Sequence, residues 1–290
     1  MYLDLERHRL AESADASPAA AVRWTVLIPF FNERDYLPAT IASLARQGVP
    51  FDLLLVDNGS TDDSADVARQ AARAHDLAAR LVTEREPGKI AALRTGLAAV
   101  HTPYVATCDA DTLYPPHYLR AAERLLERDN CVAAGAFFVA PDAGGLAAGV
   151  EAAKIVAAGA LMPRLCHAGG AGQCFRTDAL RAAGGFDPRL WRFVLEDHEI
   201  FHRLRRFGAM RYARDLWCVP SPRERDRPSI RWTLLERLLY GFAAGRAGDW
   251  FFYRFLAGRL TRRRLASVGM RERVGQDGGG QALATAHPVR

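Results

Sequence analysis

The motif most able to carry chemistry is Asp109-Ala110-Asp111, which ends a short apolar run. Two carboxylates two residues apart concentrate negative charge, which is costly at the end of a strand unless a cation compensates it. Mg²⁺ and Mn²⁺ prefer oxygen ligands and commonly take only one or two from protein, with phosphates completing the shell. Many loops contain such a motif, so its predicted position at a sheet edge is what favours a divalent-cation site for a diphosphate.

Asp57 ends an earlier apolar run and is followed by Asn58-Gly59-Ser60-Thr61-Asp62. A carboxylate at the carboxyl end of a strand can accept hydrogen bonds from a base N–H or a ribose hydroxyl. The alternative is a plain turn in which Ser60 or Thr61 caps the next helix. That alternative explains the turn residues but does not require Asp57.

Two further charged groups stand at predicted helix starts. Glu196-Asp197 begins one helix, whose N-terminus would keep a carboxylate ionised, as a general base requires. Ordinary acids at a helix start remain the alternative. Lys89 is one of only two lysines in the chain and follows Pro87-Gly88 at another helix start. It could bind a phosphate or a sugar hydroxyl, or it could be a solvated surface residue.

The elements that must position these groups alternate in the first half of the chain. Apolar strands that alternate with helices predict a parallel sheet covered on both faces, with ligands at the carboxyl edge of its strands. The predicted strands are 24–28, 52–56, 81–82 and 104–108, and the predicted helices are 36–47, 62–75 and 89–100. The second half predicts a strand at 131–139, a glycine-rich extended segment at 169–176, and helices at 145–161, 196–207 and 230–244.

Two nucleotide-binding patterns are missing from the expected places. A dinucleotide fold would follow its first strand with GxGxxG, but the residues here are Pro29-Phe30-Phe31-Asn32-Glu33. Pro87-Gly88-Lys89-Ile90 likewise lacks the Ser or Thr that a P-loop has after its lysine. A nucleotide, if bound, must be held in another way.

Composition sets the broad class. The chain has 290 residues, enough for one large α/β domain or two small ones, and its 49% of apolar residues is typical of a globular protein. The net charge of +6 suits anionic partners, or it serves only to keep the protein soluble. The five cysteines are scattered and odd in number, which favours a reducing compartment.

We find no signal-peptide pattern and no apolar run of spanning length, so the expected location is the cytoplasm, with peripheral contact to the inner membrane face left open. The spread arginines and the lack of a recognition module predict no nucleic-acid partner.

Together these motifs resemble the family 2 glycosyltransferases of the GT-A fold. The matching segments span Trp24 to Gly208 and are 26–33, 56–62, 87–89, 109–111, 184–187 and 196–197. The resemblance implies a single Rossmann-like, mostly parallel α/β sheet flanked by helices, with a C-terminal helical extension. We expect a flexible arm at 1–20, a GT-A domain at 21–228, a helical segment at 229–268 and a disordered tail at 269–290. The nucleotide-binding half would be 22–112 and the acceptor-binding half 113–228.

The resemblance also implies roles for particular residues. Asp111 would bind Mg²⁺ or Mn²⁺, Asp197 would be the catalytic base, and Glu196 and Gly170 would lie at the acceptor. The nucleotide-sugar, with UDP, GDP or dTDP as its nucleotide, would contact Pro29, Phe31, Glu33, Asp57, Lys89 and Asp109. The implied reaction inverts the anomeric centre in one displacement onto a glycan or lipid-linked acceptor.

The chain departs from the pattern of processive synthases in this family. Their Gln-x-x-Arg-Trp motif has Pro228 in place of Gln here, although Arg231-Trp232 is present, so a single addition is expected. Arg223, Arg225, Arg227 and Arg231 could close over the diphosphate or form a basic surface loop. Segment 231–264 mixes arginine with aromatic residues, which suits an interfacial helix at a membrane, a homodimer face or a lid.

Two other functions remain open on the sequence alone. A sugar-1-phosphate nucleotidyltransferase would use similar metal chemistry, but it needs a glycine-rich basic loop where Phe30-Phe31-Asn32-Glu33 stands. A non-catalytic carbohydrate- or nucleotide-binding protein would not need Asp109, Asp111 and Asp197 together.

Overall fold

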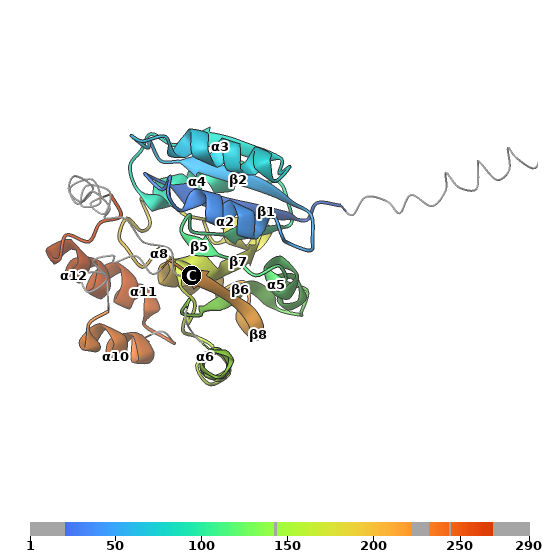
Figure 1. The fold of residues 1–290 in the computed structure, drawn as a ribbon. Coiled ribbons are helices and arrows are strands. Elements are labelled where there is room, and N and C mark those ends of the chain that lie inside the picture. The colour runs from blue at the N-terminus through green and yellow to red at the C-terminus, as the bar shows by residue number, and fades with distance from the viewer. Residues whose placement is uncertain (1–20, 142–143, 222–231, 244, 269–290) are drawn as a thin grey trace, which may run out of the picture.

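The computed structural model describes residues 21–141, 144–221, 232–243 and 245–268. Its centre is an eight-stranded sheet in the order β3-β2-β1-β4-β7-β6-β8-β5, with helices on both faces (Figure 1). The predicted α/β class with a helical C-terminal extension is confirmed.

The first half forms the parallel part of the sheet. The pairings within this half are all parallel, so the carboxyl ends of the first, second and fourth strands share one rim. The strands are β1 (Trp24–Phe30), β2 (Phe51–Asp57), β3 (Ala79–Thr83) and β4 (Tyr104–Thr107). The helices between them are α2 (Leu37–Leu44), α3 (Ser64–Ala74) and α4 (Lys89–Ala98).

The second half continues the sheet with mixed directions. Strand β7 lies antiparallel between β4 and β6, whereas β6 and β8 run parallel to each other. The strands are β5 (Thr112–Leu113), β6 (Cys131–Phe138), β7 (Gln173–Arg176) and β8 (Ala209–Pro220). The helices are α5 (Tyr118–Leu126), α6 (Gly145–Leu161), the 3-10 turn η1 (Gly170–Gly172), α7 (Thr177–Ala182) and α8 (Glu196–Leu204).

The sheet has an apolar layer on each face. Successive strand side chains point to opposite faces, so Leu27 enters one layer and Val26 and Ile28 enter the other. All seven residues of β1 are buried, as expected for a central strand covered on both sides. This burial fixes the position of the loop that follows β1.

The C-terminal helices share the layer that contains Leu27. Phe251, Phe252, Leu256 and Leu260 are fully buried in it. The elements are α10 (Leu234–Ala243), α11 (Gly248–Trp250), the π-helix η2 (Phe251–Leu256) and α12 (Ala257–Arg262), drawn in orange and red beside α8 in Figure 1. Among the helices of the described ranges, none has both the length and the apolar character needed to cross a membrane.

Polar contacts also tie this C-terminal segment to α8. Glu199 is buried and accepts hydrogen bonds from Arg203 at 2.7 Å and from the Tyr253 hydroxyl at 2.6 Å. His202 forms a 2.7 Å contact with Asp249. Because α8 begins with Glu196 and Asp197, these contacts fix the helix that carries both acids.

Candidate active site

The loops that follow β1 and β2 are joined by side-chain hydrogen bonds. The backbone N–H of Asn32 donates to Ser60 Oγ at 3.1 Å, and Asn32 Oδ1 accepts the backbone N–H of Thr61 at 2.8 Å. The expectation that Ser60 or Thr61 caps α3 was therefore wrong, because both side chains bind the neighbouring loop and α3 begins only at Ser64. These contacts hold the two loops of the rim at a fixed spacing.

Four of the residues predicted to bind the nucleotide-sugar lie on β1, on β2 or on the loop that follows β1. Pro29 is in β1 opposite Val56, and Phe30 is paired with Asp57, so Phe31 and Glu33 follow directly beside the end of β2. The Asp57 carboxylate is buried and accepts the backbone N–H of Ser60 at 2.8 Å. The structure thus brings Pro29, Phe31, Glu33 and Asp57 to one part of the rim.

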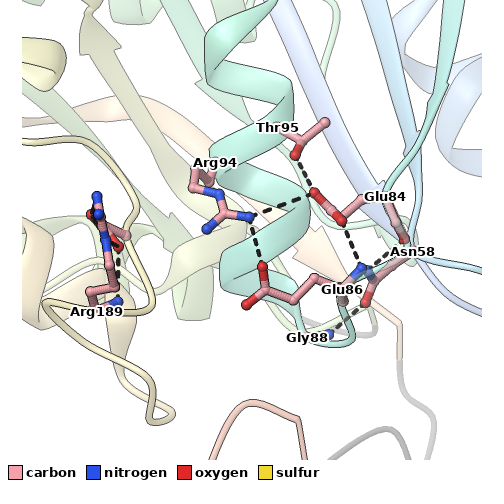
Figure 2. A network of polar contacts seen from close by, with 8 residues as sticks. Asn58, Glu84, Glu86, Gly88, Arg94, Thr95 and Arg189 are labelled. Carbon is pink, nitrogen blue, oxygen red and sulfur yellow. Dashed lines mark hydrogen bonds and ion pairs between the residues drawn. The ribbon is translucent and has the colours of Figure 1, made fainter.

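Asn58 organises the segment that leads to Lys89 (Figure 2). Its Nδ2 donates to the carbonyl oxygens of Glu84 at 3.2 Å and Glu86 at 2.7 Å, and its Oδ1 accepts the N–H of Gly88 at 2.7 Å. Gly88 has φ of +118°, a conformation that glycine adopts at little cost. One side chain therefore fixes both ends of the turn before Lys89, although its sequence context, Asp57-Asn58-Gly59, predicts only a turn residue.

Glu84 stabilises the same turn from its other side. Its carboxylate accepts the N–H of Glu86 at 2.7 Å and the hydroxyl of Thr95, as Figure 2 shows. The hydrogen bond from Thr95 lowers the pKa of Glu84, outweighing the opposite effect of burial. Arg94 lies 2.7 Å from Glu86 Oε2, so the turn is also bound to the first part of α4.

Lys89 joins the two halves of the site. Its Nζ lies 2.7 Å from Asp109 Oδ1 and 3.5 Å from Glu196 Oε1. Lys89, Glu196, Asp197 and Gly170 line one small pocket. A Cβ atom on Gly170 would lie 3.3 Å from Lys89 Nζ and 3.6 Å from Glu196 Oε1, so the absence of a side chain keeps this space open.

The charges of this cluster shift one another's pKa values. Burial alone would lower the pKa of Lys89, but Asp109, Glu196 and Asp197 raise it overall. Burial raises the pKa of Glu196, with Asp197 adding to this effect and Lys89 opposing it. Burial acts in the same direction on Asp197, but His198 outweighs it and the pKa of Asp197 is lowered. The two adjacent acids are thus driven apart in pKa.

His198 holds Asp197 in place, and only its position next to Asp197 in the sequence could have indicated this role. Asp197 Oδ1 lies 2.9 Å from His198 Nδ1 and also accepts the backbone N–H of His198 at 2.9 Å. The imidazole ring contacts Trp232 and Tyr240, with ring centroids 5.0 and 5.8 Å away. The C-terminal segment therefore supports the predicted base through His198.

Tyr114 is a second residue that sequence reasoning missed. Its hydroxyl accepts the backbone N–H of Asp109 at 2.9 Å and donates to the carbonyl oxygen of Ala171 at 2.9 Å. The side chain is fully buried and so links the acidic motif to the turn that contains Gly170. No local pattern marks a tyrosine for this role.

The charge of Asp109 is compensated by protein. The cation that compensates this acid is Lys89, whose Nζ lies 2.7 Å from Asp109 Oδ1, and the assignment of a metal to Asp111 stays a prediction. Asp111 is buried to 6% exposure, and its carbonyl oxygen accepts the N–H of Ser221 at 2.8 Å. Within the described ranges, no group of three or more His, Cys, Asp or Glu side chains could hold a metal ion. The carboxylates fit a hard cation that takes its remaining ligands from a diphosphate.

The basic residues predicted to close over the diphosphate, Arg223, Arg225, Arg227 and Arg231, lie outside the described residues.

Sequence comparison identifies related proteins. Residues 25–165 match the family model for glycosyl transferase family 2. An uncharacterized glycosyltransferase of Mycobacterium tuberculosis (strain H37Rv) is 40% identical over 87 residues, which cover 30% of this chain and 36% of the relative. Undecaprenyl-phosphate 4-deoxy-4-formamido-L-arabinose transferase of Pseudomonas syringae is 34% identical over 109 residues, covering 36% of this chain and 32% of the relative. The match thus spans about a third of each curated relative.

Solved structures share the fold at low sequence identity. The mannosyltransferase PcManGT of Pyrobaculum calidifontis, in complex with GDP-Man and Mn²⁺, superposes with a TM-score of 0.61 at 22% identity, covering 96% of this chain and 84% of that one. S. aureus TarS 1–349 in complex with UDP-GlcNAc gives a TM-score of 0.56 at 15% identity, covering 83% and 73%. Residues 25–165 thus match glycosyl transferase family 2, and the fold of the chain is that of the GT-A glycosyltransferases.

Proposed function

We propose that the chain is a metal-dependent, inverting glycosyltransferase that moves one sugar from a nucleotide-diphosphate sugar to an acceptor hydroxyl. The observation that carries the proposal is that Lys89 and Asp109 meet Glu196 and Asp197 in one place. The first two residues come from the nucleotide-binding half (22–112), called the donor half below, and the last two come from the acceptor-binding half (113–228), called the acceptor half. Such a constellation can bind an anionic donor and deprotonate an acceptor in one site.

In the donor half, Pro29, Phe31, Glu33 and Asp57 would hold the base and ribose. Lys89 and Asp109 would contact the remaining part of the nucleotide-sugar, and the turn built by Asn58 would keep Lys89 in position. Asp111 would hold Mg²⁺ or Mn²⁺, which when bound supplies charge neutralisation for the departing diphosphate. Solved structures of similar fold hold GDP-Man or UDP-Glc together with Mn²⁺, which supports this class of donor and metal.

In the acceptor half, Asp197 would be the general base. Its lowered pKa keeps the carboxylate ionised at neutral pH, and His198 orients it. As the acceptor oxygen attacks the anomeric carbon, its proton passes to Asp197 and the bond to the diphosphate breaks on the opposite face of the sugar. Glu196 and Gly170 would border the acceptor, which is a glycan or a lipid-linked molecule.

The cellular setting belongs to the same proposal. All five cysteines are unpaired and buried, which supports a reducing location such as the cytoplasm. Exposed Leu234, Leu238 and Phe242 on α10 support either contact with the inner membrane face or a homodimer face.

The reaction can be tested with purified protein, Mn²⁺ and a panel of UDP-, GDP- and dTDP-sugars. The expected product is the nucleoside diphosphate, released by transfer or by slow hydrolysis. Release of pyrophosphate from a nucleoside triphosphate and a sugar-1-phosphate would instead indicate a nucleotidyltransferase. Binding of a donor without any turnover would indicate a non-catalytic binding protein.

A further inference from the structure

A groove of about 330 Å³ lies between β6 and α6, and the proposed reaction does not by itself use it. Its lining is mostly apolar and consists of Ala136, Phe137, Phe138, Ile155, Ala158 and Gly169, together with Glu151, Lys154 and His167. The volume is within the usual range of about 300–1,000 Å³ for small-molecule sites.

Two consecutive glycines separate the groove from the pocket of the acid pair, because Gly169 lines the groove and Gly170 lines the pocket with Glu196 and Asp197. A Cβ on Gly169 would lie 2.5 Å from the ring of Phe138, so that ring rests directly on the glycine backbone. The next residue is Gly170, which lies against Lys89 and Glu196. A molecule whose hydroxyl reached Asp197 could therefore extend past this pair of glycines into the groove.

The polar side chains of the groove already have partners within the protein. Lys154 Nζ lies 2.6 Å from Glu151 Oε1, so these opposite charges cancel. His167 Nε2 lies 3.1 Å from the carbonyl oxygen of Met162, and burial lowers the pKa of His167. A glycan needs many side-chain hydrogen bonds and an anion needs an uncompensated cation, so this lining suits neither.

Helix α6 continues the apolar surface outward. Of its 17 residues only Ala152 and Ile155 are buried, although the helix is rich in alanine and carries few charges. Leu161 is 81% exposed and Val150 is 52% exposed. Both lie on the side of the helix that carries Lys154, at spacings of four and seven residues. Apolar surface of this kind commonly marks a binding site.

We infer that the groove between β6 and α6 binds the hydrocarbon chain of a lipid acceptor whose head group presents its hydroxyl to Asp197. This inference rests on the proposed function for the identity of the reacting end. The occupant is a lipid because the walls are mostly apolar, because the charges of Lys154 and Glu151 cancel, and because the groove meets the pocket of the acid pair at the consecutive residues Gly169 and Gly170.

Photoaffinity labelling tests the inference without relying on turnover. The probe is a hexadecyl β-glucoside with a diazirine in its alkyl chain, and its competitors are unlabelled hexadecyl and methyl β-glucosides. Two neighbouring alanines provide matched variants: Ala158→Trp fills the groove, whereas Ala157→Trp places the same side chain on the exposed side of α6. Circular dichroism of both variants checks that they fold.

We expect the labelled residues to lie within 131–169 and the labelling to be suppressed by the hexadecyl but not by the methyl competitor. The labelling yield should decrease at least fivefold in Ala158→Trp and stay unchanged in Ala157→Trp. Labels elsewhere, equal competition by the two glucosides, or equal labelling of both variants would overturn the inference. Donor binding is measured separately on the wild type by thermal shift. A labelled groove without donor binding would reject the proposed function alone, and donor binding with an unlabelled groove would reject the lipid site alone.

Discussion

The Nζ atom of Lys89 lies 2.7 Å from Oδ1 of Asp109, so the first residue of α4 compensates the acid that follows β4. The nearby Glu196 brings a second carboxylate to the same ammonium group at 3.5 Å. The conformation that makes this possible is set by Asn58, which fixes the turn immediately before Lys89. A cation held in this way can meet an anionic donor without first having to become ordered.

Replacing Lys89 by Met should destabilise the fold as well as weaken donor binding. The side chain is about one-third exposed, so the loss should be about 1–3 kcal/mol rather than the larger cost of breaking a fully buried pair. The loss should be largest at neutral pH and shrink on acidification, because protonation of Glu196, whose pKa is raised, removes one uncompensated charge. Urea unfolding at pH 7 and pH 5 measures both effects.

The matched control is Lys154→Met, which removes the only other lysine from an exposed pair with Glu151. Its effect on unfolding should stay within about 0.5 kcal/mol. Equal losses in the two variants would mean that the Lys89 cluster has no special energetic role.

Asp197→Asn should abolish transfer while donor binding is retained. The amide keeps the size of the side chain but cannot accept the acceptor proton, and loss of a general base lowers rates by about 10²–10⁴-fold. Steady-state transfer and donor thermal shift are the two measurements. Asp66→Asn on the exposed face of α3 is the control and should retain full activity. Normal transfer by Asp197→Asn would remove this residue from the mechanism.

His198→Phe should change the pH dependence of kcat/KM. His198 lowers the pKa of Asp197, so its removal should raise that pKa. Because a base works only above its pKa, the acid limb of the profile should move to higher pH, with a loss that is larger at pH 5 than at pH 8. Phenylalanine preserves a ring between Trp232 and Tyr240. The exposed His101→Phe variant should keep the wild-type profile, and an unshifted profile in His198→Phe would contradict the positioning role.

Asn58→Ala should weaken donor binding through the turn before Lys89. Three hydrogen bonds are lost, two to the carbonyl oxygens of Glu84 and Glu86 and one from Gly88. We expect the donor KM to rise about tenfold with a smaller change in kcat, equivalent to about 1.4 kcal/mol of binding. Asn58→Asp keeps an oxygen that can accept the Gly88 N–H but has no donors, so its defect should remain. Wild-type KM in both variants would show that the turn holds Lys89 without this side chain.

The sequence predicted the parts of the site that local patterns encode. Apolar runs located β1, β2 and β4, and the rule that parallel strands share a carboxyl edge brought Asp57 and Asp109 to one rim. The antiparallel insertion of β7 between β4 and β6 had no such signal, because strand order depends on contacts distant in sequence.

The missed residues share a physical reason. Tyr114 and His198 act through contacts that form only after the two halves of the chain have packed together. Local propensity made Ser60 or Thr61 an alternative cap of the next helix, yet both side chains form tertiary hydrogen bonds to Asn32 instead. The ion pair of Asp109 likewise has no local pattern, because its partner is Lys89, which precedes it by 20 residues.

The most direct test of the account is thermal shift of the wild type and Asp111→Asn with UDP-, GDP- and dTDP-sugars, each with and without Mn²⁺. At a hundredfold excess over Kd, binding should stabilise the wild type by about 2.7 kcal/mol and raise its Tm by several degrees. The account predicts that at least one donor gives this shift only with Mn²⁺, and that Asp111→Asn loses it. No shift with any nucleotide-sugar, or the same metal-dependent shift in Asp111→Asn, would contradict the account.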